Sequence, residues 1–172
     1  MTPEQFRALY PQLLSWIEQT LAKYKNDAHP VTSLGFRRLP QYFSKELLAS
    51  TKVVSVAHVP APPLSEFGTT GFEEFENMDG AGTTYLDTYF VQTKEAGREW
   101  LHFHELIHVV QWRLLGPERF VATYAAGLER FGYRNNPLET IAYDTQAKFE
   151  GDQTTFDAEH SVRTQLHLLN LI

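Results

Sequence analysis

The chain has 172 residues, of which 42% are hydrophobic, a net charge of -6 and no cysteine. This length predicts one domain spanning residues 1–172, and the acidic balance argues against nucleic-acid binding, which needs clustered Lys and Arg. No apolar run approaches the roughly 20 residues that span a bilayer, and the N-terminal residues lack the pattern of a secretory leader. We therefore expect a soluble cytoplasmic protein that binds neither nucleic acid nor membranes.

Two helices are predicted before the first strand. Thr2 and Gln5 form a capping-box pattern ahead of apolar residues that recur at helical spacing through Tyr24. Pro11 lies inside this segment and is expected to kink the helix or to split it in two. Residues 39–49 are predicted to form a second, short helix.

Two strands and an irregular connection are predicted in the middle of the chain. Residues 51–59 are rich in β-branched side chains and run into a proline-rich stretch, which favours a strand that ends there. Residues 83–92 are predicted to form the second strand. Between them, residues 64–82 contain four glycines and a cluster of acidic residues that includes Glu73 and Glu74. We favour a solvated connection over a substrate-gating or cation-binding loop for this stretch, because its acidic residues lack the spacing of a calcium-binding loop.

The most informative motif lies in the next predicted helix, over residues 95–115. Residues 104–108 read HELIH, the HExxH pattern. Positions four apart on a helix project in nearly the same direction, so the rings of His104 and His108 could reach one tetrahedral zinc ion. Glu105 lies beside them, where it could accept a proton from a water without ligating the metal.

A catalytic zinc usually has three protein ligands, so a third ligand is expected elsewhere. The metzincin continuation would need Gly at position 111 and His at position 114, but the chain has Gln111 and Leu114. Cysteine is absent, which leaves a carboxylate or a histidine. We favour Glu139, and Asp144, His160 and His167 are alternatives.

Glu139 falls in the first turn of another predicted helix. Asn136 is a suitable N-cap and Pro137 a suitable first helical residue, and Glu139, Tyr143 and Gln146 then share one face. A carboxylate in a first helical turn also interacts favourably with the helix dipole without any metal, which is the simpler reading of Glu139. Further helices are predicted over residues 118–130 and 156–171.

The segments HELIHVVQ (104–111) and NPLETIAY (136–143) resemble the metallopeptidases that combine HExxH with a downstream glutamate, the gluzincin type. They are especially similar to small bacterial zincin-like domains of largely unassigned function. The resemblance covers roughly residues 84–150. It implies zinc as the cofactor, His104, His108 and Glu139 as its ligands, and Glu105 as the general base.

The resemblance has one departure. Thermolysin-like enzymes carry an Asp four residues after the ligand Glu, where it orients a ligand His, and this chain has Tyr143 there. We expect Tyr143 to stabilise the oxyanion in catalysis, with Tyr133 and Arg134 as alternatives.

The expected architecture is α+β and zincin-like. A small, mostly antiparallel sheet would pack on the HExxH helix, and the second helix would supply the third ligand. In zincins a strand such as residues 84–92 can lie at the sheet edge and pair with an extended peptide beside the zinc.

The leading functional hypothesis is therefore a zinc-dependent hydrolase of the metallopeptidase type, acting on a peptide or protein. The first alternative is a zinc-binding structural or interaction domain without catalysis. The second is a metal-free interaction domain in which HExxH is incidental.

Overall fold

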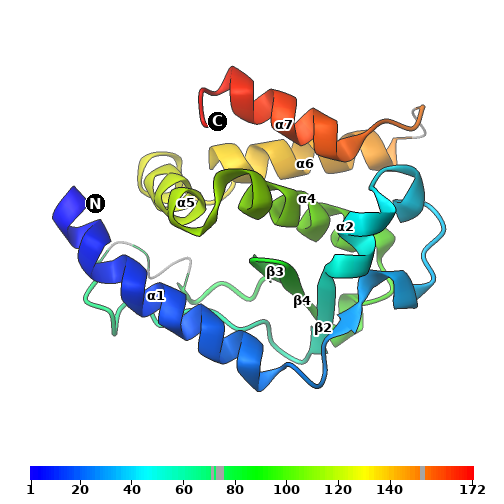
Figure 1. The fold of residues 1–172 in the computed structure, drawn as a ribbon. Coiled ribbons are helices and arrows are strands. Elements are labelled where there is room, and N and C mark those ends of the chain that lie inside the picture. Colours follow the sequence, from blue (N-terminus) through cyan, green and yellow to red (C-terminus); the bar gives the residue numbers. More distant parts are fainter. Residues whose placement is uncertain (71, 73–75, 152–153) are drawn as a thin grey trace.

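The computed structural model describes residues 1–172 except 71, 73–75 and 152–153. The described residues form six α-helices and an open four-stranded sheet, a mixed α+β arrangement. Helices α6 and α7 lie on one side of α4 and the sheet lies on the other, while α1 runs along the far side of the molecule (Figure 1). None of the helices in the described part has the length and apolarity needed to cross a bilayer.

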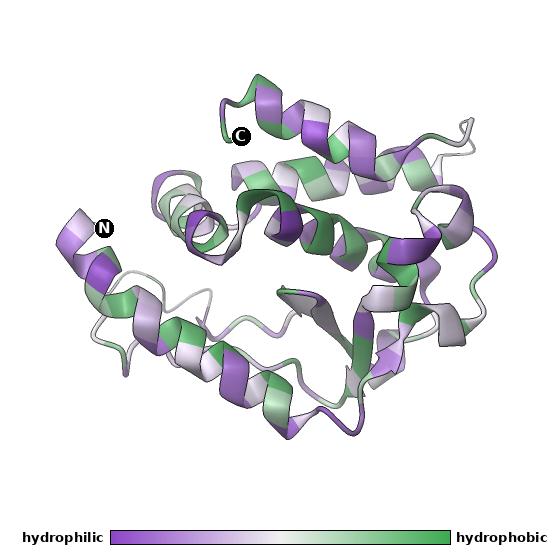
Figure 2. Cartoon of the chain, viewed as in Figure 1, coloured by the Kyte–Doolittle hydropathy of each residue, from purple (hydrophilic) through white to green (hydrophobic). Residues whose placement is uncertain are grey.

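Helix α4, Glu99–Leu115, is the centre of the fold. It contacts the sheet and helices α5, α6 and α7, and most of its residues are buried. Figure 2 shows it as hydrophobic along most of its length. A helix that is apolar on nearly all sides must be surrounded by other elements, so the composition of α4 explains its central place.

The sheet has the strand order β1-β2-β4-β3, with strands His29–Pro30, Lys52–Val56, Gly82–Tyr85 and Thr88–Gln92 in sequence order. β1 with β2 and β3 with β4 pair antiparallel, whereas β2 and β4 are parallel. Two of the three pairings are thus antiparallel, in line with the expected small, mostly antiparallel sheet. β3 is an edge strand, and it faces α4.

The prediction of one strand over residues 83–92 is wrong, because this segment is a β-hairpin. Tyr85 pairs with Thr88, so Leu86 and Asp87 form a two-residue turn. Leu86 has a φ of 59°, in the left-handed region that two-residue hairpin turns require. Such turns favour Asn-Gly or Asp-Gly, and the Leu-Asp pair gives no such signal.

Two further predictions for the N-terminal half need correction. Helix α1, Pro3–Lys23, has its capping box, but it continues through Pro11 and is not split in two. The single helix predicted over residues 39–49 is instead a 3₁₀ turn at Leu39–Gln41 followed by α2, Lys45–Ser50. Ser44 begins α2 because its hydroxyl accepts a hydrogen bond from the amide of Leu47.

The loop before the hairpin is only partly described. Leu64 to Thr70 contain no helix or strand, as expected for a connection. The acidic Glu73 and Glu74, together with Gly71 and Phe75, lie outside the described residues.

The C-terminal half consists of three helices that follow α4. Their bounds are Pro117–Phe131 for α5, Pro137–Glu150 for α6 and Ala158–Leu168 for α7. Helix α4 ends at Leu115, as predicted, and Gly116, with a φ of 75°, separates it from α5. The short connections keep these helices against α4 and bring the start of α6 beside the HExxH motif.

An aromatic cluster joins α4 to α6 on the side away from the hairpin. The rings of Phe103 and Phe149 are stacked with centroids 4.3 Å apart, and Tyr42 packs edge-on against both. Phe103 is fully buried. It therefore fixes the position of α6, and with it any residue that α6 presents to α4.

We expect Phe103→Ala to lower the free energy of unfolding by about 3–5 kcal/mol, because it leaves a cavity at this contact. Chemical denaturation would measure the loss. Phe131→Ala removes the same side chain from a position that is 46% exposed, and it should cost far less. Equal losses in the two variants would contradict the assigned role of the cluster.

Candidate metal centre

The two histidines of the HExxH motif lie together on the buried face of α4. Their Nε2 atoms are 3.2 Å apart, and the residues are 5% and 6% exposed for His104 and His108. One helical turn separates them, so the regular geometry of α4 alone places both rings over the same point.

Glu139 comes from the first turn of α6 and is also buried. Asn136 caps this helix by accepting a hydrogen bond from the amide of Leu138, and its own Nδ2 donates to the carbonyl of Tyr124 on α5. Gly127 makes this contact possible, since a Cβ there would lie 2.6 Å from Asn136 Oδ1. The start of α6 is thus held against α5 and beside the histidines.

The ligand atoms of His104, His108 and Glu139 form a small triangle. Glu139 Oε2 lies 3.4 Å from His104 Nε2, and Oε1 lies 3.4 Å from His108 Nε2. Zinc–ligand bonds of about 2.0–2.1 Å correspond to tetrahedral edges of about 3.3–3.4 Å. The three residues form a buried group that could hold a metal ion.

The hydrogen bonds around His108 leave its Nε2 lone pair directed into this triangle. Its Nδ1 lies 2.8 Å from Gln111 Oε1, and Gln111 Nε2 donates to the carbonyl of Leu138. The amide of Gln111 is thereby oriented with its oxygen toward His108, so Nδ1 carries the proton and donates it. Nε2 is then free to bind a metal ion.

His104 is arranged in the same way by α6. Its Nδ1 lies 3.0 Å from Gln146 Oε1, and Gln146 Nε2 donates to Glu150. Both Nε2 lone pairs and a carboxylate therefore face one another in a buried site. Glu139 Oε2 has no hydrogen-bond partner among the described residues. Such a set of acceptors needs a proton or a cation between them, and a divalent ion satisfies all three.

The pKa values of His108 and Glu139 also indicate that positive charge is stabilised in this site. Burial by itself lowers the pKa of His108, but the carboxylates of Glu139 and Glu105 and the hydrogen bond to Gln111 together outweigh it, and the pKa is raised to about 9. Burial raises the pKa of Glu139, but the two histidines hold it well below its usual range. The group therefore favours a cation among its ligand atoms.

A tyrosine on α5 orients the carboxylate. The hydroxyl of Tyr124 donates a 2.6 Å hydrogen bond to Glu139 Oε1. This contact holds the carboxylate in the plane that faces the histidines.

Glu105 lies beside the triangle but outside the ligand group. Its Oε2 accepts a 2.7 Å hydrogen bond from the hydroxyl of Thr84 on β3. Gly82 lies against its Oε1, at a place where a Cβ would come within 2.4 Å. Burial raises the pKa of Glu105, although His104 and His108 oppose the shift. The side chain is thus held by β3, with a higher affinity for a proton than an exposed glutamate has.

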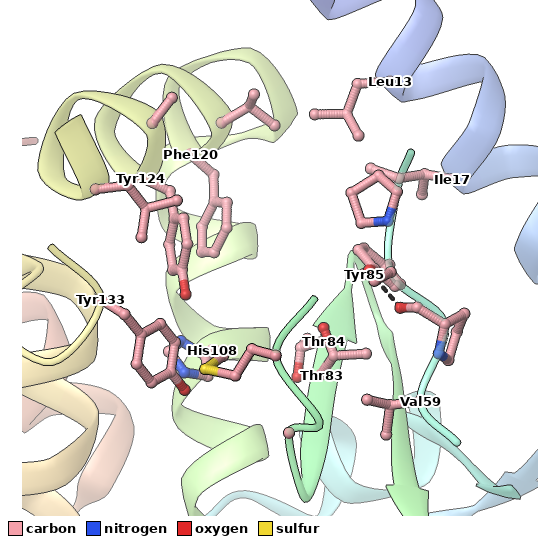
Figure 3. A pocket seen from close by; sticks show the side chains of 18 of the residues that line it. Leu13, Ile17, Val59, Thr83, Thr84, Tyr85, His108, Phe120, Tyr124 and Tyr133 are labelled. Atoms are coloured by element: carbon pink, nitrogen blue, oxygen red, sulfur yellow. Dashed lines mark hydrogen bonds between the residues drawn. The ribbon is translucent and has the colours of Figure 1, made fainter. Parts of the chain in front are cut away.

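The remaining predicted site residues lie around the centre or away from it. The ring of Tyr143 packs on His104, with centroids 4.6 Å apart, and the guanidinium of Arg134 lies over it. Tyr133 lines the cavity that opens beside the ligands, and in Figure 3 its ring lies next to His108. The alternative ligands Asp144, His160 and His167 are exposed and do not join the group.

Sequence reasoning did not assign roles to Gln111, Gln146, Tyr124 and Thr84. Gln146 had been placed on the same helical face as Glu139, and this spacing was the available signal for it. Its amide oxygen orients the ring of His104. Tyr124 and Thr84 come from other elements, so no local spacing relates them to the motif.

Comparison of the chain with protein-family models, with curated proteins and with solved structures finds no match.

Replacing the glutamines should weaken metal binding without removing a ligand. We expect Gln111→Ala and Gln146→Ala each to lower zinc affinity about 10–100-fold, because the ligand rings lose the partners that fix their orientation. Competition with a chromophoric chelator would measure it. Gln12→Ala, an exposed change on α1, is the control. Wild-type affinity in both site variants would contradict the assigned roles.

Proposed function

We propose that this protein is a zinc-dependent hydrolase of the metallopeptidase type. The observation that carries the proposal is the triangle of His104, His108 and Glu139 ligand atoms, with the carboxylate of Glu105 beside it. Zinc held there would act as a Lewis acid that polarises a carbonyl and makes a water easier to deprotonate.

Glu105 would act as the general base. Thr84 occupies Oε2, so Oε1 is the atom that accepts the proton of the attacking water and returns it to the leaving amine. Gly82 leaves room for this atom, and burial raises the affinity of the carboxylate for the proton.

Tyrosines beside the ligands are candidates for stabilising the oxyanion. Tyr143 remains a prediction, but its ring packs on His104 and it is not among the residues that line the cavity. Tyr133 does line the cavity beside His108 (Figure 3), so we favour its hydroxyl as the donor.

A peptide or protein substrate is favoured by the position of β3. This edge strand carries Thr84 and Gly82, which contact Glu105, so an extended chain that paired with it would pass beside the metal ligands. Trp112 already donates to the carbonyl of Thr84, which leaves the Gly82 end of β3 for such pairing.

The competing hypothesis is a zinc ion that only joins α4 to α6. Structural zinc sites usually close with four protein ligands. Within the described part of the chain the ligand group has three members, and a cavity opens beside them. An open position beside a glutamate that does not ligate is what a catalytic site needs, and this favours the hydrolase.

Metal content tests the centre itself. Protein purified without chelator should hold one zinc per chain by elemental analysis, and His108→Ala or Glu139→Ala should lose it because each removes a ligand. His167→Ala, which changes an exposed histidine on α7, should keep the ion. A folded wild type that binds no zinc when the ion is supplied would remove the basis of the proposal.

Glu105→Gln tests catalysis apart from binding. The amide has the shape of the carboxylate but cannot accept the proton, so the variant should retain zinc and lose peptidase turnover by at least about 100-fold. The assay is cleavage of a quenched-fluorescent peptide library with zinc content measured on the same sample. Activity at the wild-type level would exclude Glu105 as the base, and a zinc-loaded wild type without turnover would favour the structural hypothesis.

A further inference from the structure

A cavity of about 140 Å³ opens directly beside the metal centre. We call it the apolar chamber. Its walls come from α1, α5, β3 and the loop before β3, and Figure 3 shows Leu13 and Ile17 of α1 at the opposite end from His108. Helix α5 contributes Phe120, Val121 and Ala125. The chamber therefore extends from the ligand group at one end to aliphatic and aromatic side chains at the other.

At the end away from the metal centre, the described residues of the chamber offer nothing to bind a charged group. The described residues that line it include no Lys, Arg or Asp, and its ionisable members are the metal-centre residues and tyrosines. Tyr85 uses its hydroxyl to donate to the carbonyl of Pro60, and Tyr124 donates to Glu139. A carboxylate or an ammonium moved into this end would lose its hydration without gaining a partner among the described residues, which disfavours its binding.

The volume limits the size of the occupant. An engineered apolar cavity of about 150 Å³ in another protein binds benzene. A chamber of about 140 Å³ thus accommodates one phenyl or branched-aliphatic group.

We propose that the apolar chamber binds one uncharged aromatic or branched-aliphatic side chain and thereby sets the specificity of the site. The identification of this group as the residue that flanks the cleaved amide bond rests on the proposed hydrolase function. The binding of the group itself does not depend on hydrolase activity, because the walls of the chamber belong to α1, α5 and the hairpin.

The test uses toluene as a neutral probe and phenylacetate as a charged one, with the full chain kept in chelator. Toluene should bind saturably and shift the methyl NMR signals of Leu13, Ile17 and Val121. Phenylacetate should bind at least tenfold more weakly, because the ring is the same but the described residues at the α1 end include no cation for its carboxylate, and at the other end the carboxylates of Glu105 and Glu139 repel it.

Two alanines on α5 give a matched pair of variants. Ala125 lines the chamber, whereas its neighbour Ala126 is exposed. Ala125→Leu adds three carbon atoms to the wall and should weaken toluene binding at least tenfold, while Ala126→Leu should leave it unchanged. If Ala125→Leu does not fold, Val121→Phe fills the same space and replaces it.

The possible results separate this proposal from the hydrolase. A folded wild type without saturable toluene binding, equal binding to Ala125→Leu, or equal binding of phenylacetate would overturn the chamber proposal. Toluene binding in a protein that never takes up zinc would support the chamber and count against the hydrolase. With zinc-dependent turnover established, Ala125→Leu should reduce kcat/KM for peptides with Phe or Leu at the cleavage site more than for peptides with Ala.

Discussion

The structure depends on one constraint, which is that two imidazole nitrogens lie 3.2 Å apart in a buried site, each 3.4 Å from one oxygen of the Glu139 carboxylate. Two imidazole lone pairs and a carboxylate repel one another unless positive charge lies between them. The surrounding elements hold them there. α4 places the histidines, the capped start of α6 places the glutamate, and the aromatic cluster around Phe103 holds the two helices together. The packing between α4 and α6 thus holds together three acceptor groups that repel one another unless positive charge lies between them.

The partners of the ligands keep the charge of this site low. Ligand histidines often donate to carboxylates, but here both donate to glutamine amides. The amides orient the rings without adding negative charge beside Glu139 and Glu105. A divalent ion would then be balanced by these two carboxylates, and a buried site without net charge avoids a large desolvation cost. The choice of Gln111 and Gln146 is therefore consistent with a deeply buried centre.

The parts of this arrangement that the sequence could predict are those set by local spacing. His104 and His108 are related by one helical turn, and Asn136 and Pro137 mark the start of α6, so both helices and their ligand candidates could be read directly. The hairpin was missed because its turn, Leu86-Asp87, lacks the glycine that usually marks a two-residue loop. Gln111 and Tyr124 could not be assigned, because their roles depend on how α5 and α6 pack against α4. Long-range packing, and not local propensity, sets the partners of the ligands.

Helix α5 links the metal centre to the proposed specificity of the site. The hydroxyl of Tyr124 orients Glu139, and on the same helix Val121, one turn earlier, and Ala125, the next residue, form a wall of the apolar chamber. Phe120 stacks on Trp112, whose indole donates to Thr84, and Thr84 in turn holds Glu105. A group that fills the chamber therefore contacts the same helix that orients Glu139 and, through Trp112 and Thr84, supports Glu105, the proposed base. In this arrangement binding of the apolar side chain and alignment of the reacting groups are not independent, because a shift of α5 would disturb both.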